Sequence, residues 1–181
     1  MRMARSRGQL TGSHIPGSSN WLAALRTYLV ISGMGHLAWE AIQLPLYTIW
    51  STGTIRELAF AVLHCTGGDI LIALSALAAA LILIGEPAWP SHRFGSVYVL
   101  TVGFGIGYAV FSEWLNTGVR GNWAYSDWMP TLPWIGTGLS PLLQWAAIPM
   151  LALLALRHLP SYATSSIPAR ATYLKRRGVI D

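Results

Sequence analysis

Charged residues and cysteines are scarce in this chain. Asp, Glu, Lys and Arg make up only 10% of its 181 residues, whereas soluble domains carry about 25%. A single cysteine, Cys65, excludes an intramolecular disulfide and a Cys-x-x-Cys metal site. Because 53% of the residues are hydrophobic, the shortage of charge predicts an all-α, multi-pass protein of the cell membrane.

The basic residues are placed as topology signals. The net charge is +5, but no basic face alternates with exposed aromatic residues and no nucleic-acid-binding motif is present. Lysines and arginines instead gather outside the apolar segments, which predicts that both termini are cytoplasmic. The short connections favour a bacterial inner membrane. Arg56 and Arg120 fall on the non-cytoplasmic side, whereas the cytoplasmic side receives Arg2, Arg5, Arg7, Arg93, Arg157, Arg170, Lys175, Arg176 and Arg177.

Four apolar segments are long enough to cross a bilayer, which requires about 20 residues. They cover residues 21–47, 55–84, 96–117 and 140–158. The sequence therefore predicts a four-transmembrane-helix bundle over residues 21–158. A basic tail at 1–20 is expected to be disordered because it is rich in Arg, Gly and Ser, and a basic cytoplasmic tail covers 159–181.

Short motifs predict how individual helices begin and pack. Thr54 and Glu57 form a T-x-x-E capping box ahead of the second segment. Ser140, which is followed by a proline, predicts the N-cap of the fourth helix. A Gly-x-x-x-Gly pattern at Gly103 and Gly107 predicts a close packing face on the third helix.

The long connection at 118–138 is unusually rich in aromatic residues. Aromatic side chains at this density are typical of the membrane–water interface. They also fit a lid over a polar site, and the sequence leaves both interpretations open. The residues concerned are Trp123, Tyr125, Trp128, Met129 and Trp134.

Five ionisable residues interrupt the apolar segments: His36, Glu40, His64, Asp69 and Glu113. A charged side chain at the bilayer centre costs ~2.5–3.5 kcal/mol, and no lysine or arginine is an obvious partner for them. His36 and Glu40 are four residues apart and share a helix face. In antiparallel helices, residues whose numbers add to a nearly constant total lie at one depth. This rule predicts a Glu40–His64 pair and a His36–Asp69 pair.

These groups predict an acid–base or ligand-binding site in the outer half of the bundle. We expect Glu40 and Glu113 to act as acid, base or cation-stabilising groups, tuned by His36, His64 and Asp69. Other polar and aromatic side chains reach the same region from the first, third and fourth helices and from the long connection. The expected ligand-binding residues are Trp39, Gln43, Tyr47, Trp114, Asn116, Trp123, Tyr125, Gln144 and Trp145.

One segment resembles a known family. His36-Leu-Ala-Trp-Glu40, with Tyr47 beyond it, is similar to the H-x-x-x-E segment of the emopamil-binding (EXPERA) membrane proteins, which include sterol isomerases and the sigma-2 receptor. Glu113 and Trp145 resemble, in role, a carboxylate and a tryptophan on later helices of that family. The resemblance implies protonation of a sterol or isoprenoid double bond, or binding of an amphiphilic amine.

Two other classes of function stay open. His36 and His64 could ligate haem or a metal ion between facing helices, although the preferred interpretation requires no cofactor. The chain could also be a non-catalytic subunit or assembly factor of a larger membrane complex. The expected partners are membrane lipid and a lipid-soluble small molecule, with other membrane subunits or a homo-oligomer as further options and no nucleic acid.

Cysteine labelling tests the predicted orientation. In a version with Cys65 replaced, Ser126→Cys should react with a membrane-impermeant maleimide added from the non-cytoplasmic side, because the charge bias places the long connection there. Labelling only from the cytoplasmic side would reverse the topology.

Overall fold

A computed structural model describes residues 18–86, 89–90 and 92–157, and every named element in these ranges is a helix. The predicted tails at 1–20 and 159–181 lie outside the described residues, except that the first helix already begins at Ser18. The all-α prediction is confirmed for the described part of the chain. In order, the elements are α1 (Ser18–Gln43), the 3-10 helix η1 (Leu44–Leu46), α2 (Ile49–Thr52), α3 (Ile55–Ile84), α4 (Phe94–Glu113), the π-helix η2 (Trp114–Val119) and α5 (Leu139–Leu156).

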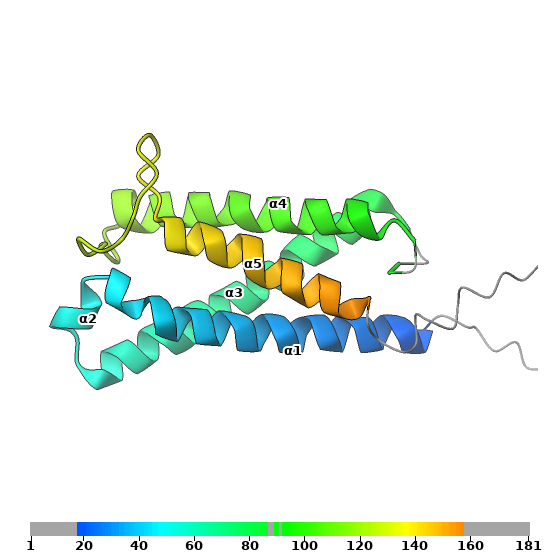
Figure 1. Cartoon of the computed structure of the whole chain (residues 1–181), viewed down its shortest axis with the longest axis horizontal. Coiled ribbons are helices and arrows are strands. Elements are labelled where there is room, and N and C mark those ends of the chain that lie inside the picture. The colour runs from blue at the N-terminus through cyan, green and yellow to red at the C-terminus, as the bar shows by residue number, and fades with distance from the viewer. Residues whose placement is uncertain (1–17, 87–88, 91, 158–181) are drawn as a thin grey trace, which may run out of the picture.

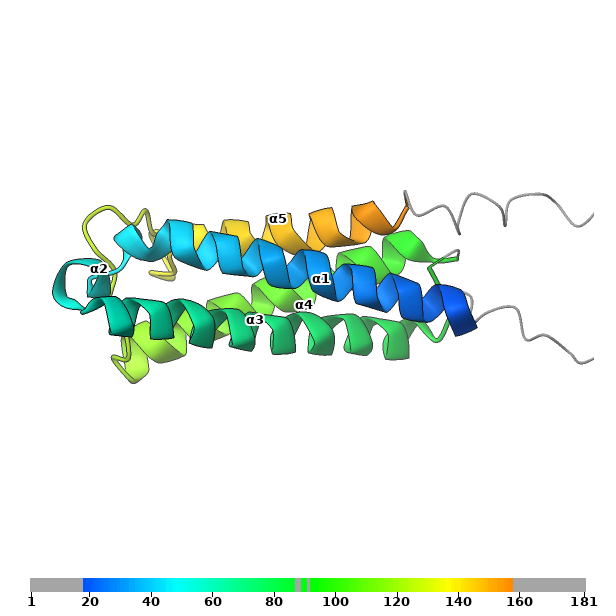
Figure 2. The ribbon, with the colours of Figure 1, turned by 90° about the horizontal axis from the view of Figure 1, so that it is seen from below.

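The long helices pack side by side along one axis. Helix α1 packs against α3 and α5, and α4 packs against the same two helices from the opposite side (Figures 1 and 2). The short helix α2 and the connection at 120–138 lie at one end, which we call the loop end. In the view of Figure 1, α3 and α4 meet at the end away from the loop end and diverge toward the loop end, and in the view of Figure 2 they cross.

Three of the described helices are long and apolar enough to cross a membrane. They are α3 with 30 residues, α4 together with η2 with 26, and α5 with 18. Helix α1 is not among them, although it has 26 residues. It carries Arg26, His36 and Glu40, which lower its hydropathy. Helix length and composition therefore support three of the four expected spans and do not support α1.

The helix boundaries differ from the sequence-based expectation at two places. Helix α1 ends at Gln43 rather than at 47 because Pro45 lacks an N–H and disfavours helical geometry in the residue before it. Helix α5 begins one residue before Ser140, with Gly138 as N-cap and no side-chain cap. The predicted N-cap at Ser140 is therefore wrong, and its hydroxyl takes part in the polar site described below.

The predicted start of α3 is confirmed. The backbone N–H of Glu57 donates to Thr54 Oγ1, and the backbone N–H of Thr54 donates to Glu57 Oε2 at 2.7 Å. Both N–H groups would otherwise lack partners at the first turn of the helix. The carboxylate of Glu57 is thus committed to the cap.

Close packing of α4 depends on a different glycine from those predicted. An added Cβ at Gly105 would overlap the indole ring of Trp145, a core residue of α5. Added Cβ atoms at Gly103 and Gly107 would meet nothing within 4 Å. Gly105 is separated from each of them by two residues, about 200° around the helix, so the packing face lies opposite the Gly-x-x-x-Gly stripe.

Alanine substitutions at these glycines should show which face of α4 packs against α5. Gly105→Ala is expected to lower the free energy of unfolding by ~1–3 kcal/mol, because the buried indole must move. The matched controls Gly103→Ala and Gly107→Ala should be neutral or stabilising by up to ~1 kcal/mol, because alanine favours helix and no contact is disturbed. Thermal unfolding in detergent micelles measures the difference. Equal effects at all three positions would contradict this packing.

Candidate functional site

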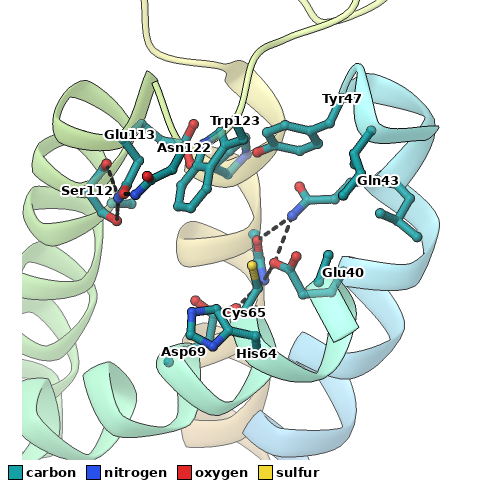
Figure 3. A pocket seen from close by; sticks show the side chains of 18 of the residues that line it. Glu40, Gln43, Tyr47, His64, Cys65, Asp69, Ser112, Glu113, Asn122 and Trp123 are labelled. Carbon is teal, nitrogen blue, oxygen red and sulfur yellow. Dashed lines mark hydrogen bonds between the residues drawn. The ribbon is translucent and has the colours of Figure 1, made fainter. Parts of the chain in front are cut away.

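A cavity of about 1090 Å³ lies between α1, α3, α4 and α5 at the loop end. Glu40 and Gln43 reach it from α1, and Glu113 faces them from α4 across the cavity (Figure 3). Tyr47 and Trp123 lie across its top, and His64, Cys65 and Asp69 of α3 form its floor in that view (Figure 3). Of the predicted site residues, the lining includes Glu40, Gln43, Tyr47, His64, Asp69, Glu113, Asn116, Trp123, Gln144 and Trp145, and omits His36, Trp39, Trp114 and Tyr125.

The amide of Gln144 is the centre of a buried polar network. Its Nε2 donates to Asp69 Oδ2 at 2.9 Å and to Glu40 Oε1 at 3.0 Å. Only 2% of Gln144 is exposed, so a neutral side chain of α5 supplies hydrogen bonds to carboxylates of both α3 and α1. In the described part of the chain, no lysine or arginine lies within ion-pair distance of either carboxylate.

His36 pairs with Asp69, as the depth rule predicts. The imidazole is fully buried, and its Nδ1 lies 3.3 Å from Asp69 Oδ2 and 2.9 Å from Gln144 Nε2. Because both N–H groups of Gln144 are directed to carboxylates, the network assigns the Nδ1 proton to His36, which donates to Asp69. Nε2 is then an acceptor, and it is buried without a hydrogen-bond partner among the described residues.

The predicted Glu40–His64 pair does not form. Glu40 accepts from Gln43 Nε2 at 2.8 Å in addition to Gln144, and no ion pair joins it to His64. His64 is exposed on α3 and stacks on Phe60, with ring centroids 5.4 Å apart. Five residues separate His64 from buried Asp69, which is about 140° around the helix. The two side chains therefore cannot both face α1.

Ser140 extends the network toward the loop end. Its hydroxyl donates to Gln43 Oε1 at 2.8 Å and accepts from Trp39 Nε1 at 3.1 Å. Trp39 thus supports the cavity wall from behind, although it does not line the cavity. Gln43 Nε2 also lies 3.4 Å from Gln144 Oε1. The polar network, consisting of His36, Trp39, Glu40, Gln43, Asp69, Ser140 and Gln144, therefore joins α1, α3 and α5.

On the opposite wall, Glu113 is bound to the long connection. The hydroxyl of Tyr125 donates to Glu113 Oε2 and accepts from the backbone N–H of Gly138 at 2.9 Å. The indole of Trp123 lies beside Glu113, with a buried Nε1 that makes no hydrogen bond of normal geometry. These contacts attach the connection to α4 at the point where α4 passes into η2. π-Helical turns of this kind are frequent at functional sites.

The same connection is attached to the segment after α1. Tyr47 and Tyr125 form an isolated antiparallel bridge, and their rings lie 5.6 Å apart. The backbone N–H of Ser126 donates to Leu46 O at 2.9 Å. Backbone hydrogen bonds therefore fix the connection to the segment after α1, and the Tyr125 side chain fixes it to α4. This part of the connection has the position expected of a lid.

The aromatic residues of the connection divide into two groups. Trp123 and Tyr125 are partly buried at the cavity, whereas Trp128 is 81% exposed and Trp134 is 97% exposed. Each of the two interpretations left open by the sequence thus fits a different part of the connection. The inner pair has the position of a lid, and the outer pair has the exposure expected of an interfacial belt.

The tyrosine hydroxyls at the cavity top remain protonated. Burial raises the pKa of Tyr47, and the Glu113 and Glu40 carboxylates raise it further. Burial also raises the pKa of Tyr125, with the hydrogen bond to Glu113 acting in the same direction. The hydroxyl of Tyr47 makes no hydrogen bond to another described residue, so it can donate to a molecule in the cavity.

The site does not have the geometry of a metal centre. In the described ranges, no three His, Cys, Asp or Glu side chains converge closely enough to hold a metal ion. His36 is engaged with Asp69 through Nδ1, and His64 stands apart from it on the exposed face of α3.

The lining also includes residues that were not expected at the site from the sequence, among them Arg56, Ser112, Arg120 and Asn122. Asn122 Nδ2 donates to Asn116 Oδ1 at 2.7 Å, and Asn116 Nδ2 donates to the carbonyl of Ser112 at 2.8 Å. The two arginines were interpreted only as topology signals. A four-residue spacing along α4 and η2, from Ser112 through Asn116 to Arg120, was the available signal that they share a face.

Comparison with known proteins assigns no family to this arrangement. No protein-family model, curated protein or solved structure matches the chain.

The network predicts a graded response to substitution. Gln144→Leu should lower the free energy of unfolding by about 3 kcal/mol, because it removes hydrogen bonds from buried Asp69 and half-buried Glu40 at once. Ser140→Ala at the edge of the network should cost about 1 kcal/mol. Chemical or thermal unfolding of the purified protein measures both. An equal or larger loss for Ser140→Ala would show that Gln144 is not the centre.

Proposed function

We propose that the protein is a four-span membrane protein whose cavity binds a lipid-soluble ligand with one cationic or proton-accepting centre. The observation that carries this proposal is the convergence of Glu40, Asp69 and Glu113 on one cavity without a lysine or arginine at ion-pair distance in the described residues. Buried carboxylates need hydrogen bonds and a balancing charge. The network supplies the hydrogen bonds, and a ligand cation or a bound proton supplies the charge.

The membrane location rests on the outer surface as well as on helix length. Large apolar side chains are exposed along α3 and α4, including Ile82 at 79% and Val99 at 64%. Such surfaces suit lipid better than water. Helix α1 directs His36 and Gln43 inward, where both are buried. We propose that α1 is the fourth span, shielded on its polar side by α3 and α5, with both termini cytoplasmic.

The two cavity walls offer an acid and a base. Glu40 lies on α1 and Glu113 on α4, so a double bond held between them meets one carboxyl on either side. Transfer of a proton from a carboxyl group to one alkene carbon leaves a carbocation on the other. Loss of a neighbouring proton to the second carboxylate then completes an isomerisation without another reactant. Ring faces of Trp123 and Trp145 at the cavity favour such a cation.

This proposal agrees with the resemblance of His36-Leu-Ala-Trp-Glu40 to the EXPERA segment, which implies the same classes of ligand. An amphiphilic amine is the simplest mimic of the cationic centre. It keeps the charge and the apolar chain while removing the chemistry.

Charge removal on each wall tests the site. N,N-dimethyldodecylamine should stabilise the wild-type protein against thermal unfolding, and Glu40→Gln and Glu113→Gln should each weaken its binding at least about tenfold, as loss of a charged hydrogen bond predicts. Dodecanol should bind all of these proteins equally. Asp127→Asn, on the exposed part of the connection, is the control for charge alone. Wild-type amine affinity in both glutamate variants would mean that the cluster is structural.

A further inference from the structure

The cavity opens to the outside between α3 and α4. Phe60 and Tyr108 both line it, yet 67% of Phe60 and 46% of Tyr108 are exposed. A side chain that is exposed and also lines a cavity stands at its opening. Phe60 lies in the loop-end half of α3 and Tyr108 in the loop-end half of α4, which places the opening there.

The two sides of the opening are lined by one face of each helix. On α3 the lining residues recur every four positions, which places them on one face, and Tyr108 and Ser112 do the same on α4. Asn116 of η2 and Arg120, which follows η2, continue this side of the lining toward the loop end. Because the helices are antiparallel, residues whose numbers add to the same total lie at about the same depth. Each pair adds to the same total, and from the loop end inward the pairs are Arg56 with Arg120, Phe60 with Asn116, His64 with Ser112, and Gly68 with Tyr108.

The outermost pair is cationic and free of carboxylate partners. In the described part of the chain, neither Arg56 nor Arg120 forms an ion pair. The nearest acidic residue in sequence, Glu57, is committed to the capping box with Thr54. Arg56 also stands in the first turn of α3, where the helix dipole disfavours a cation. Helix stability therefore does not explain the arginine at this position.

We propose that Arg56 and Arg120 bind the phosphate of a long-chain phosphorylated amphiphile whose apolar chain lies in the opening between α3 and α4. This inference rests on the proposed function and specifies the class of its ligand. Arg56 and Arg120 line the same cavity from two different segments, and each offers forked N–H donors to phosphate oxygens.

The depth of the carboxylates determines which part of the ligand they meet. Glu113 ends α4, and the whole of η2 separates it from Arg120. Asp69 follows Arg56 by thirteen residues, about 20 Å along α3. A phosphate at the arginine level therefore keeps its distance from these acids. The carboxylates meet the chain of the amphiphile, where a double bond or an amine would lie, and not its headgroup.

Ligands that share one chain length test the phosphate site. Binding of dodecyl phosphate and dodecanol to the full-length protein in maltoside micelles can be compared by thermal shift and native mass spectrometry. The wild type should bind dodecyl phosphate at least about tenfold more tightly than dodecanol. The double variant Arg56→Gln/Arg120→Gln should lose this preference and keep its dodecanol affinity. Arg56→Lys/Arg120→Lys should retain part of the preference, because the charge remains.

The matched control is Arg26→Gln/Arg157→Gln, which removes the same charge at exposed positions away from the cavity. It should bind dodecyl phosphate as the wild type does. Equal dodecyl phosphate affinity in Arg56→Gln/Arg120→Gln and the wild type would overturn the inference. So would inorganic phosphate binding as tightly as dodecyl phosphate, because the site would then recognise free phosphate and not an amphiphile. Amine binding that still depends on Glu40 and Glu113 in either case would leave the proposed function intact.

Discussion

The structure depends on holding the carboxylates of Glu40 and Asp69 side by side with one neutral amide between them. Gln144 donates to both carboxylates, and His36 completes the hydrogen bonding of Asp69. Each contact crosses from one helix to another, so α1, α3 and α5 can slide or rotate past one another only by exposing a carboxylate to an apolar interior. Polar contacts therefore determine the register of these three helices, while the apolar core supplies packing without a strong preference for depth.

No side chain of α4 takes part in this polar network, so other contacts determine where α4 lies. Among the described residues, the side-chain hydrogen bonds of Glu113 and Asn116 run to the connection at 120–138 or to Ser112 of α4, and none reaches α3. Close contact between α4 and α5 occurs deeper, where Gly105 receives Trp145. At the loop end, the side-chain hydrogen bonds of Glu113 and Asn116 therefore join this part of the chain to the connection and not to α3. This leaves room for the cavity and for its opening beside α3.

The sequence predicted the depth of a residue in the bundle better than the face of the helix on which its side chain lies. Helix lengths, the Thr54 capping box and the His36–Asp69 pair follow from spacing along the chain, and all three agree with the structure. His64 and Gly105 show the limit, because a shift of two or five residues turns a side chain to another face of the helix. Ser140 shows a second limit. Its cap signal was local, but buried Gln43 on another helix offered its hydroxyl a partner that local sequence does not reveal.

Glu113 connects the chemistry of the cavity to the closure of its top. Its carboxylate accepts a hydrogen bond from Tyr125, and the same tyrosine hydroxyl accepts from the backbone N–H of Gly138 at the start of α5. A ligand group that binds this carboxylate competes with the tyrosine for it. The free energy that a ligand gains by binding Glu113 is therefore reduced by the loss of the Tyr125–Glu113 hydrogen bond, which holds the connection over the cavity. The network around Gln144 has no such competitor for Asp69, so one wall of the cavity is built as a fixed support and the other is coupled to the segment that covers it.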